Sequence, residues 1–427
     1  MKAPTETAGG ACRRTTLAVA LLVGGVLLSP AASAEAIVEA APEPVPPTRT
    51  CEACDLEESA GGDRRAGTVA GWLVHLEEAG ISPEAHLLWD GSRVLDGGVR
   101  ERWTTRWLLQ LGATFDLERL AGWKGATGFA GFHVHRGRDG SLDAGDIQAY
   151  SNIDADRFTE IDELWLEQRL LDDRVRLKVG RVDANTEFAC IDAAGDFLNS
   201  SAGFSPTILT LPTYPSPEPS VNLFVEVAPR VTVGLGIYRS ALARHVLTLS
   251  PDERFLVGEV DVRWDASGTG KLGIGGWHES ATLERFDGGT EDGTSGMFAV
   301  FEQRLWAAGA GEDAEPARAL SLFAQYGSAD EDVGDFAHHY GIGLLARGPV
   351  PGRPGDVAGV MVSRVDLSDV PAAGFPDDET AWEVFWSFEV TPWLHVQPDV
   401  QYIRHPSGSA EGIDDALVGT LRVHLDF

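Results

Sequence analysis

The sequence predicts an all-β protein, a transmembrane antiparallel β-barrel of about 16 strands with a short N-terminal periplasmic helix. Three observations lead to this fold class: an N-terminal export signal, alternation of apolar and polar residues from residue 84 to the C-terminus, and aromatic residues near the strand ends. Outer-membrane barrels combine an apolar outer band with interfacial aromatic girdles. The expected organisation is a signal peptide at 1–34, a flexible periplasmic segment at 35–70, and a barrel region at 71–427.

The N-terminus has the features of a secretory signal peptide. Arg13 and Arg14 precede an apolar run from Leu17 to Leu28, and the Ala32-Ser33-Ala34 segment offers a small-residue cleavage site. The alternative is a membrane anchor helix, but this run is shorter than the roughly 20 residues that cross a bilayer. We therefore expect export and cleavage after Ala34. Beyond residue 34 no stretch approaches 18 uncharged apolar residues, so no transmembrane helix is expected in the mature protein.

The net charge and the mean hydropathy bear on which partners and which fold the protein can have. The formal net charge is −31, which argues against a nucleic-acid partner because no basic surface would release counterions from phosphates. It argues weakly against an anion pore and is no obstacle to an uncharged solute. The mean hydropathy of −0.09 fits a barrel, because its apolar residues are spread over many alternating segments.

The segment at 35–70 is rich in proline and acidic residues and has no apolar period, so it is expected to be flexible. Cys51 and Cys54 form a C-x-x-C pair within it. A redox or zinc site would need a βαβ unit or a second ligand pair, so a local disulfide in the oxidising periplasm is favoured. Cys190 is then expected to be unpaired and structural.

A short helix is expected at 71–80, directly before the barrel. Trp72, Leu73, Leu76 and Ala79 fall on one helical face, and Gly80 provides a stop. The barrel itself is expected over 84–427.

Strands follow from the period-two alternation. Near the C-terminus, Leu421, Val423 and Leu425 alternate with Arg422 and His424, so one face is apolar and the other charged. Short turns alternate with longer loops, as expected when the short turns lie in the periplasm and the loops outside. The strands are expected near 85–92, 103–118, 126–135, 159–170, 174–181, 220–228, 231–240, 254–265, 271–284, 295–307, 317–327, 337–346, 356–366, 380–390, 393–403 and 416–427.

The third external loop, at 183–219, is much longer than the other connectors. Loops of this length without regular structure are usually functional or disordered, and Phe188, Phe197 and Phe204 disfavour disorder because they need packing partners. We hypothesise that the loop folds into the lumen and narrows the pore. The alternative is an external lid.

Candidate pore residues follow from strand parity and from the position of this loop. On the strand near 159–170, Leu164 and Leu166 are assigned to lipid, so the intervening side chains point inward. Acidic groups of the loop should then face basic groups of the wall, although ordinary salt bridges inside a polar barrel are an open alternative. The candidate pore and sugar-binding residues are Arg106, Glu163, Trp165, Glu167, Arg176, Lys178, Arg181, Asp183, Glu187 and Asp192.

Aromatic residues on the inner face could contact the C–H faces of sugars, and Trp165, Tyr238 and Phe224 are the candidates. Enzymatic motifs such as G-x-S-x-G, H-E-x-x-H and the P-loop are absent from the sequence. The pairs His133/His135 and His338/His339 have no evident third ligand. We therefore expect a protein that is not an enzyme and that has neither a cofactor nor a metal site.

Several segments together resemble the carbohydrate-selective porin family (OprB type): "GWLVHLEEAGI", "DLERLAGWKGATGFAGFHVH", "YSNIDA", "ELWLEQRLLDDRVRLKVGRVDANTEFA", "FLNSSAGF", "VTPWLHVQPDVQYIRHPSG" and "VGTLRVHLDF". The resemblance runs from about residue 71 to the end but omits most of 285–316. It implies a sixteen-stranded outer-membrane barrel through which glucose-like sugars diffuse passively. By position, it also implies pore roles for Glu167 and Gln168 and for Arg181, Asp183 and Glu187.

The alternative to a sugar-permeable porin is a general or structural outer-membrane barrel without solute preference. The expected partners are small neutral sugars, outer-membrane lipid and, during biogenesis, the barrel-assembly machinery, because the terminal Phe427 resembles its recognition signal. The sequence leaves monomer and trimer open.

Overall fold

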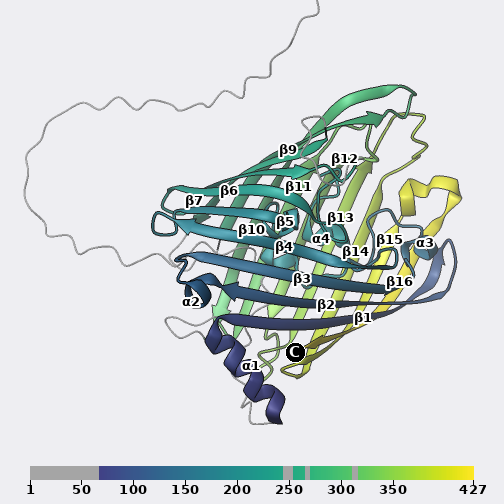
Figure 1. Ribbon diagram of the computed structural model, residues 1–427. Helices are drawn as coiled ribbons and strands as arrows, with labels where there is room; N and C mark the ends of the chain where they lie inside the picture. Colours follow the sequence, from purple (N-terminus) through teal and green to yellow (C-terminus); the bar gives the residue numbers. More distant parts are fainter. Residues whose placement is uncertain (1–66, 244–252, 265–269, 310–315) are drawn as a thin grey trace, which may run out of the picture. The chain divides into compact units, whose positions relative to one another are not determined.

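A computed structural model describes residues 67–243, 253–264, 270–309 and 316–427. In these ranges a helix, α1 (Gly67–Ala79), precedes sixteen strands that form one closed antiparallel barrel (Figure 1). Each strand pairs with its neighbours in sequence, and β1 pairs with β16 to close the sheet. The predicted signal peptide, the segment at 35–66 and both Cys51 and Cys54 lie outside the described residues.

The predicted fold class and strand number are confirmed, with shifts at some boundaries. The helix begins at Gly67 rather than at residue 71, and the first strand begins at Ile81 rather than near 85. The strands are β1 (Ile81–Gly98), β2 (Trp103–Asp116), β3 (Ala126–Gly137), β4 (Phe158–Leu170), β5 (Val175–Val182), β6 (Glu218–Ala228), β7 (Val231–Arg239), β8 (Arg254–Trp264), β9 (Gly270–Glu284), β10 (Thr290–Ala308), β11 (Arg318–Ser328), β12 (Phe336–Arg347), β13 (Val357–Leu367), β14 (Glu379–Thr391), β15 (Leu394–Arg404) and β16 (Asp414–Asp426).

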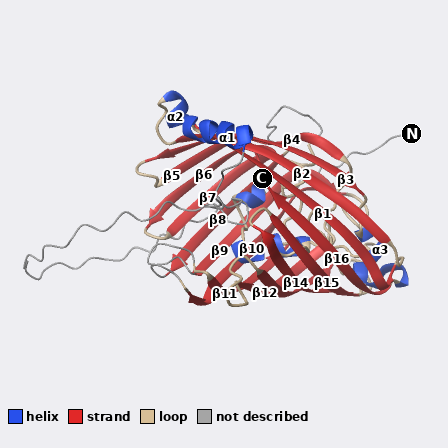
Figure 2. Ribbon diagram, turned by 90° about the horizontal axis from the view of Figure 1, so that it is seen from below, coloured by secondary structure: helices blue, strands red, loops and turns tan. Residues whose placement is uncertain are grey.

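Short helices occupy the connectors. They are α2 (Leu117–Ala121), α3 (Ser141–Ala144), η1 (Ala184–Thr186), η2 (Asp192–Ala194), α4 (Ser200–Gly203) and η3 (Pro406–Gly412). Figure 2 shows α1 and α2 at one end of the barrel and α3 at the other. The end that carries α1 has the short turns, such as Leu171–Arg174 between β4 and β5, and the opposite end has the long loops. No helix among the described residues is both long and apolar enough to cross a bilayer.

The two faces of the barrel wall differ in polarity, as the alternation predicts. On β14, Val384 is 57% exposed on the outside, whereas the neighbouring Glu383 is fully buried on the inside. Outward apolar side chains contact lipid, and the closed ladder leaves no strand edge unpaired in a medium that cannot supply hydrogen bonds. The seam between the first and last strands is long, with pairs running from His86↔Asp426 to Gly98↔Asp414.

The apolar core lies inside the barrel, between the wall and the connector at 183–217, which we call the third loop. Two clusters of buried side chains bring loop and wall residues together. The loop contributes Phe188, Ile208 and Leu211 to the first cluster and Ile191, Ala193 and Phe197 to the second. The wall contributes Phe224, Tyr238, Phe255, Trp277 and Phe298 to the first, and Phe323, Leu345, Met361 and Phe385 to the second. Burial of these side chains is the driving force that holds the loop against the inner wall.

Candidate functional site

Wall carboxylates on β10 and β14 hold the third loop through its backbone. The two oxygens of Glu302 accept hydrogen bonds from the N–H groups of Asp192 and Ala193, at 2.9 and 3.0 Å. Glu383 accepts from the N–H groups of Leu198 and Asn199, at 2.6 and 3.0 Å. A buried carboxylate needs donors and a buried backbone amide needs an acceptor, so each glutamate satisfies two otherwise orphaned groups.

Two further glutamates hold the beginning of the loop. Glu259 on β8 accepts from the N–H of Ala189 at 2.8 Å, and Glu163 on β4 accepts from the N–H of Asp183 at 2.9 Å. Glu163 is predicted from the sequence to face the pore as a sugar-binding residue, but in the structure its carboxylate is hydrogen-bonded to the loop backbone. The third loop is thus held from four strands, which fixes its path along the inner wall.

A compact charge cluster forms where β4 and β5 meet the third loop. Glu187 of the loop lies 2.6 Å from the Arg176 guanidinium and 2.5 Å from Lys178 Nζ. Glu167 on the wall lies 3.1 Å from the same Arg176. Trp165 packs its ring under Lys178, with Nζ 3.9 Å from the ring centroid. The structure therefore brings together five of the ten predicted residues.

Two carboxyl groups in the loop, outside the strands, have pKa values shifted in opposite directions from their ordinary values. Burial raises the pKa of Asp183 to about 6, even though Asn185 and Tyr214 donate backbone hydrogen bonds to its oxygens. Burial also acts on Glu187, but the charges of Lys178 and Arg176 hold the pKa of Glu187 below its ordinary value. Glu187 is therefore a fixed negative charge at neutral pH.

Asp183 has a structural role at the start of the loop. Its side chain caps the helix η1 by accepting from the N–H of Asn185 at 2.8 Å, and its other oxygen accepts from the N–H of Tyr214 at 2.9 Å. These bonds join the two ends of the loop. Asp183 thus orders the backbone, whereas the prediction placed it opposite wall cations.

Arg106 has partners that the sequence did not predict. Its Nε lies 2.7 Å from Asp154 and 3.8 Å from Asp90, and its guanidinium lies over the ring of Tyr150 at 4.9 Å. The described contacts thus pair Arg106 with the connector at 138–157 and with β1, and not with the third loop as expected.

The connector at 138–157, between β3 and β4, was missed as part of the site. Backbone N–H groups of Ile147 and Gln148 donate to Glu379 on β14, at 2.9 and 3.2 Å, and Tyr150 is buried. Asn152 donates to the carbonyl of Phe197, so this connector also touches the third loop. The buried Tyr150 and Ile153 were the available signal, because apolar residues in a loop need packing partners.

The described contacts of Arg181 and Asp192 lie outside the charge cluster. Arg181 donates from Nε to the carbonyl of Pro217 at 2.8 Å, and its guanidinium lies 3.4 Å from Glu160. Asp192 begins the helix η2, and its N–H is held by Glu302. Two aromatic candidates are corrected, because Tyr238 is fully buried and Phe224 is 7% exposed, both packed against Phe188 of the loop.

Cys190 differs from its prediction. It was expected to be unpaired, but it is disulfide-bonded, and it is buried within the third loop. The chain's other cysteines lie outside the described residues.

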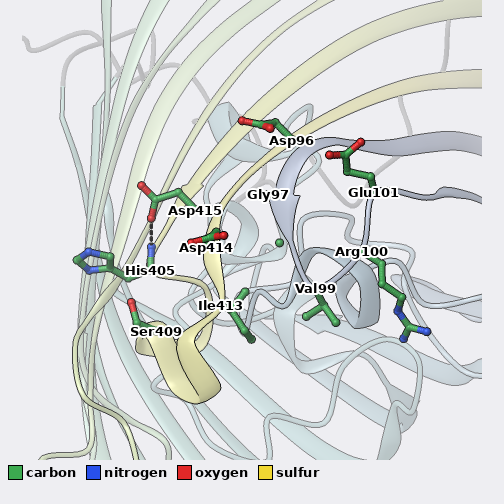
Figure 3. Close-up of a pocket in the computed structure, with 11 residues that line it drawn as sticks. Asp96, Gly97, Val99, Arg100, Glu101, His405, Ser409, Ile413, Asp414 and Asp415 are labelled. Atoms are coloured by element: carbon green, nitrogen blue, oxygen red, sulfur yellow. Dashed lines mark hydrogen bonds between the residues drawn. The ribbon is translucent and has the colours of Figure 1, made fainter.

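A pocket of about 810 Å³ lies at the long-loop end of the β1–β16 seam (Figure 3). Its lining is strongly acidic and includes Asp96, Glu101, Asp414 and Asp415, the last of which accepts from the N–H of His405 at 2.9 Å. None of the ten predicted pore residues lines it. The pocket is therefore separate from the charge cluster between β4, β5 and the third loop.

Known proteins similar to this chain share one class. The family model described as "Carbohydrate-selective porin, OprB family" matches residues 101–427. Porin B of Pseudomonas aeruginosa is 24% identical over 422 residues, covering 84% of this chain and 90% of that protein. The putative porin QuiX of Acinetobacter baylyi is 23% identical over 414 residues, covering 84% and 92%.

Solved structures agree on the fold. The high-pH structure of Pseudomonas putida OprB matches with a TM-score of 0.74 at 21% identity, covering 84% of this chain and 97% of the other. The low-pH structure of the same protein has a TM-score of 0.55 at 20% identity. At this level of sequence identity, the structural similarity shows only that the barrel architecture is shared.

Proposed function

Because this chain belongs to the carbohydrate-selective porin family of the OprB type, we propose that it is a channel through which small neutral sugars, such as glucose, diffuse passively. The family and the sixteen-stranded barrel place the protein in the bacterial outer membrane. Members of a porin family are channel proteins rather than enzymes.

The observation that carries the proposal is the position of the third loop. Its backbone is hydrogen-bonded to glutamates on the inner faces of β4, β8, β10 and β14. A loop held in this way reduces the open cross-section of the barrel, and small solutes are then separated by size. We propose that the narrowest part of the pore lies beside this loop.

The charge cluster supports a preference for polar, uncharged solutes. Arg176, Lys178, Glu167 and Glu187 bring cations and carboxylates within hydrogen-bond distance of one another. Groups of this kind donate to and accept from hydroxyls. Because the opposite charges are paired, their field on a passing ion is largely compensated. Arg176, the least buried of the four side chains, is the group that can donate to a sugar hydroxyl.

The alternative function is a general or structural barrel with no solute preference. Liposome swelling with the purified protein separates the two. We expect arabinose and glucose to enter faster than an amino acid of similar size. Equal rates for the sugars and the amino acid would overturn the preference for carbohydrates, and no entry of any of them would overturn the channel itself.

A further inference from the structure

The seam between the first and last strands carries a cluster of metal-ligating side chains that the pore does not use. Nδ1 of His86 on β1 lies 2.7 Å from Oδ1 of Asp426, and Nε2 of His424 lies 2.8 Å from the same oxygen. The three potential ligand atoms all lie within 4.8 Å of one another. We propose that His86, His424 and Asp426 form a binding site for a divalent transition-metal ion of the zinc type.

Barrel closure brings these residues together. His86 pairs in register with Asp426 across the seam, although the two are separated by almost the whole barrel sequence. Leu421 of β16 and Phe427, which follows the strand, are exposed on the outside, so the alternating His424 and Asp426 point into the lumen. Sequence spacing cannot reveal such a site, which is why the sequence predicted no metal.

The donor set suits zinc or a related ion. Two imidazole nitrogens and one carboxylate oxygen are borderline ligands, and three protein ligands leave a fourth position for water. Zinc bonds to nitrogen and oxygen are about 2.0–2.2 Å long, so ligand atoms within this cluster need only small shifts to share one ion.

The surroundings leave the Asp426 carboxylate available to the imidazoles. Arg422, the inward residue two positions earlier on β16, is paired with both oxygens of Asp90 at 2.8 Å. A further imidazole, His395 on β15, has its ring centroid 6.3 Å from that of His424. It lies within range to become a fourth ligand after a change of rotamer.

The location gives the site a structural consequence. The chain ends at the same end of the barrel as α1, where the short turns lie (Figures 1 and 2). A metal ion bound there would join β1 to β16 and so tie the barrel seam near its periplasmic mouth. Binding to the folded barrel alone would then stabilise it by mass action.

The test is zinc binding to the full-length, folded protein without a polyhistidine tag and without reducing agent. We expect isothermal titration with zinc chloride to give one site per chain. The variants His86→Ala and His424→Ala should each weaken binding by at least about tenfold, since loss of outer-sphere partners alone costs 10–100-fold. Zinc should also raise the temperature at which the wild-type barrel unfolds on heat-modifiability gels, and it should not do so in these variants.

Two histidine variants serve as controls. His278→Ala removes a histidine on the outer side of β9 whose ring is hydrogen-bonded to the Ser295 hydroxyl of β10. His405→Ala disrupts a second cluster of potential ligands among the described residues, which His405 forms with Asp377 and Asp378. Both should bind zinc like the wild type. The proposal is overturned if the wild type binds no zinc, if His86→Ala and His424→Ala retain full affinity, or if His405→Ala alone abolishes binding.

Discussion

At the scale of single residues, Glu187 is the most constrained charge of the candidate site. Its carboxylate is shared by Arg176 and Lys178, and its side chain is fully buried between the third loop and β5. Removing one partner of a buried ion pair leaves the other charges uncompensated. Glu167 remains 3.1 Å from Arg176 and 3.8 Å from Lys178, so it compensates only part of that loss.

Glu187→Gln should therefore destabilise the barrel by about 3 kcal/mol and move its ion selectivity toward anions. The exposed Glu101→Gln is the matched control and should change neither property. Urea unfolding measures the first effect, and the reversal potential in a salt gradient measures the second. The selectivity shift should shrink as salt rises above about 0.1 M, where the Debye length is about 10 Å. Unchanged ion selectivity of the Glu187→Gln variant at low salt would show that Glu187 does not act on ions in the pore.

Because its pKa is raised, Asp183 should make the stability of the folded protein depend on pH in the opposite sense to a carboxylate whose pKa is lowered on folding. Its pKa is about 6 in the folded protein, above the ordinary 3.8. The folded state therefore binds the proton more tightly, so this group's stabilising contribution is complete below about pH 4 and is lost as pH rises through 6. Relative to Asp183→Asn, the wild type should gain stability on acidification from pH 7.5 to 4.5. Heat-modifiability midpoints at both pH values test this, and a constant difference would contradict it.

At the scale of elements, the third loop is fixed mainly through backbone amides. Glu302 and Glu383 each use two oxygens to accept two neighbouring N–H groups. A glutamine in either position offers one acceptor oxygen and turns an NH₂ group toward the loop amides. Such a change removes one acceptor and adds a repulsive donor with little change in volume.

The double variant Glu302→Gln and Glu383→Gln should therefore loosen the loop while leaving the barrel assembled. We expect single-channel recordings to show larger current fluctuations and a higher mean conductance than those of the wild type. Glu101→Gln again controls for the loss of a negative charge. A quiet channel of wild-type conductance would show that the apolar clusters alone fix the loop.

Sequence reasoning found the third loop but misassigned part of its chemistry. Phe188 and Phe197 revealed the loop's need for packing, and parity placed Arg176 and Lys178 on the inner wall. The backbone donors that meet Glu302 and Glu383 have no signature in the sequence, because every non-proline residue carries the same N–H. The partners of Arg106 depend on how the connector at 138–157 folds, which local pattern does not determine.

At the scale of the whole molecule, period-two alternation predicted the strand number, and the export signal and the aromatic residues near the strand ends distinguished a membrane barrel from a soluble sandwich. Each strand satisfies its backbone hydrogen bonds only through its neighbours, so the sixteen strands must close into a ring in lipid. The seam is different. Its register places His86 beside Asp426 and Asp90 beside Arg422, and these pairs depend on the closure itself rather than on any local segment.

The C-terminal residue completes the seam and is expected to direct assembly. The N–H of Phe427 donates to the carbonyl of Ala85 at 2.9 Å, and its side chain is 70% exposed toward the outside. Phe427→Asp should sharply reduce the amount of barrel in the outer membrane, whereas Phe427→Tyr should not. A charge near the interface costs about 1 kcal/mol or less, so a large loss points to recognition by the assembly machinery. Normal amounts of heat-modifiable Phe427→Asp protein would argue against that role.

We propose that the third loop sets the size limit of a sugar-permeable pore. The most direct measurement is liposome swelling with sugars of increasing size, comparing the wild type with a variant in which a tight turn replaces 183–217. We expect the shortened variant, once shown to form a heat-modifiable barrel, to admit larger sugars and to have a higher single-channel conductance. A folded variant with the wild-type size limit and conductance would show that the loop does not narrow the pore.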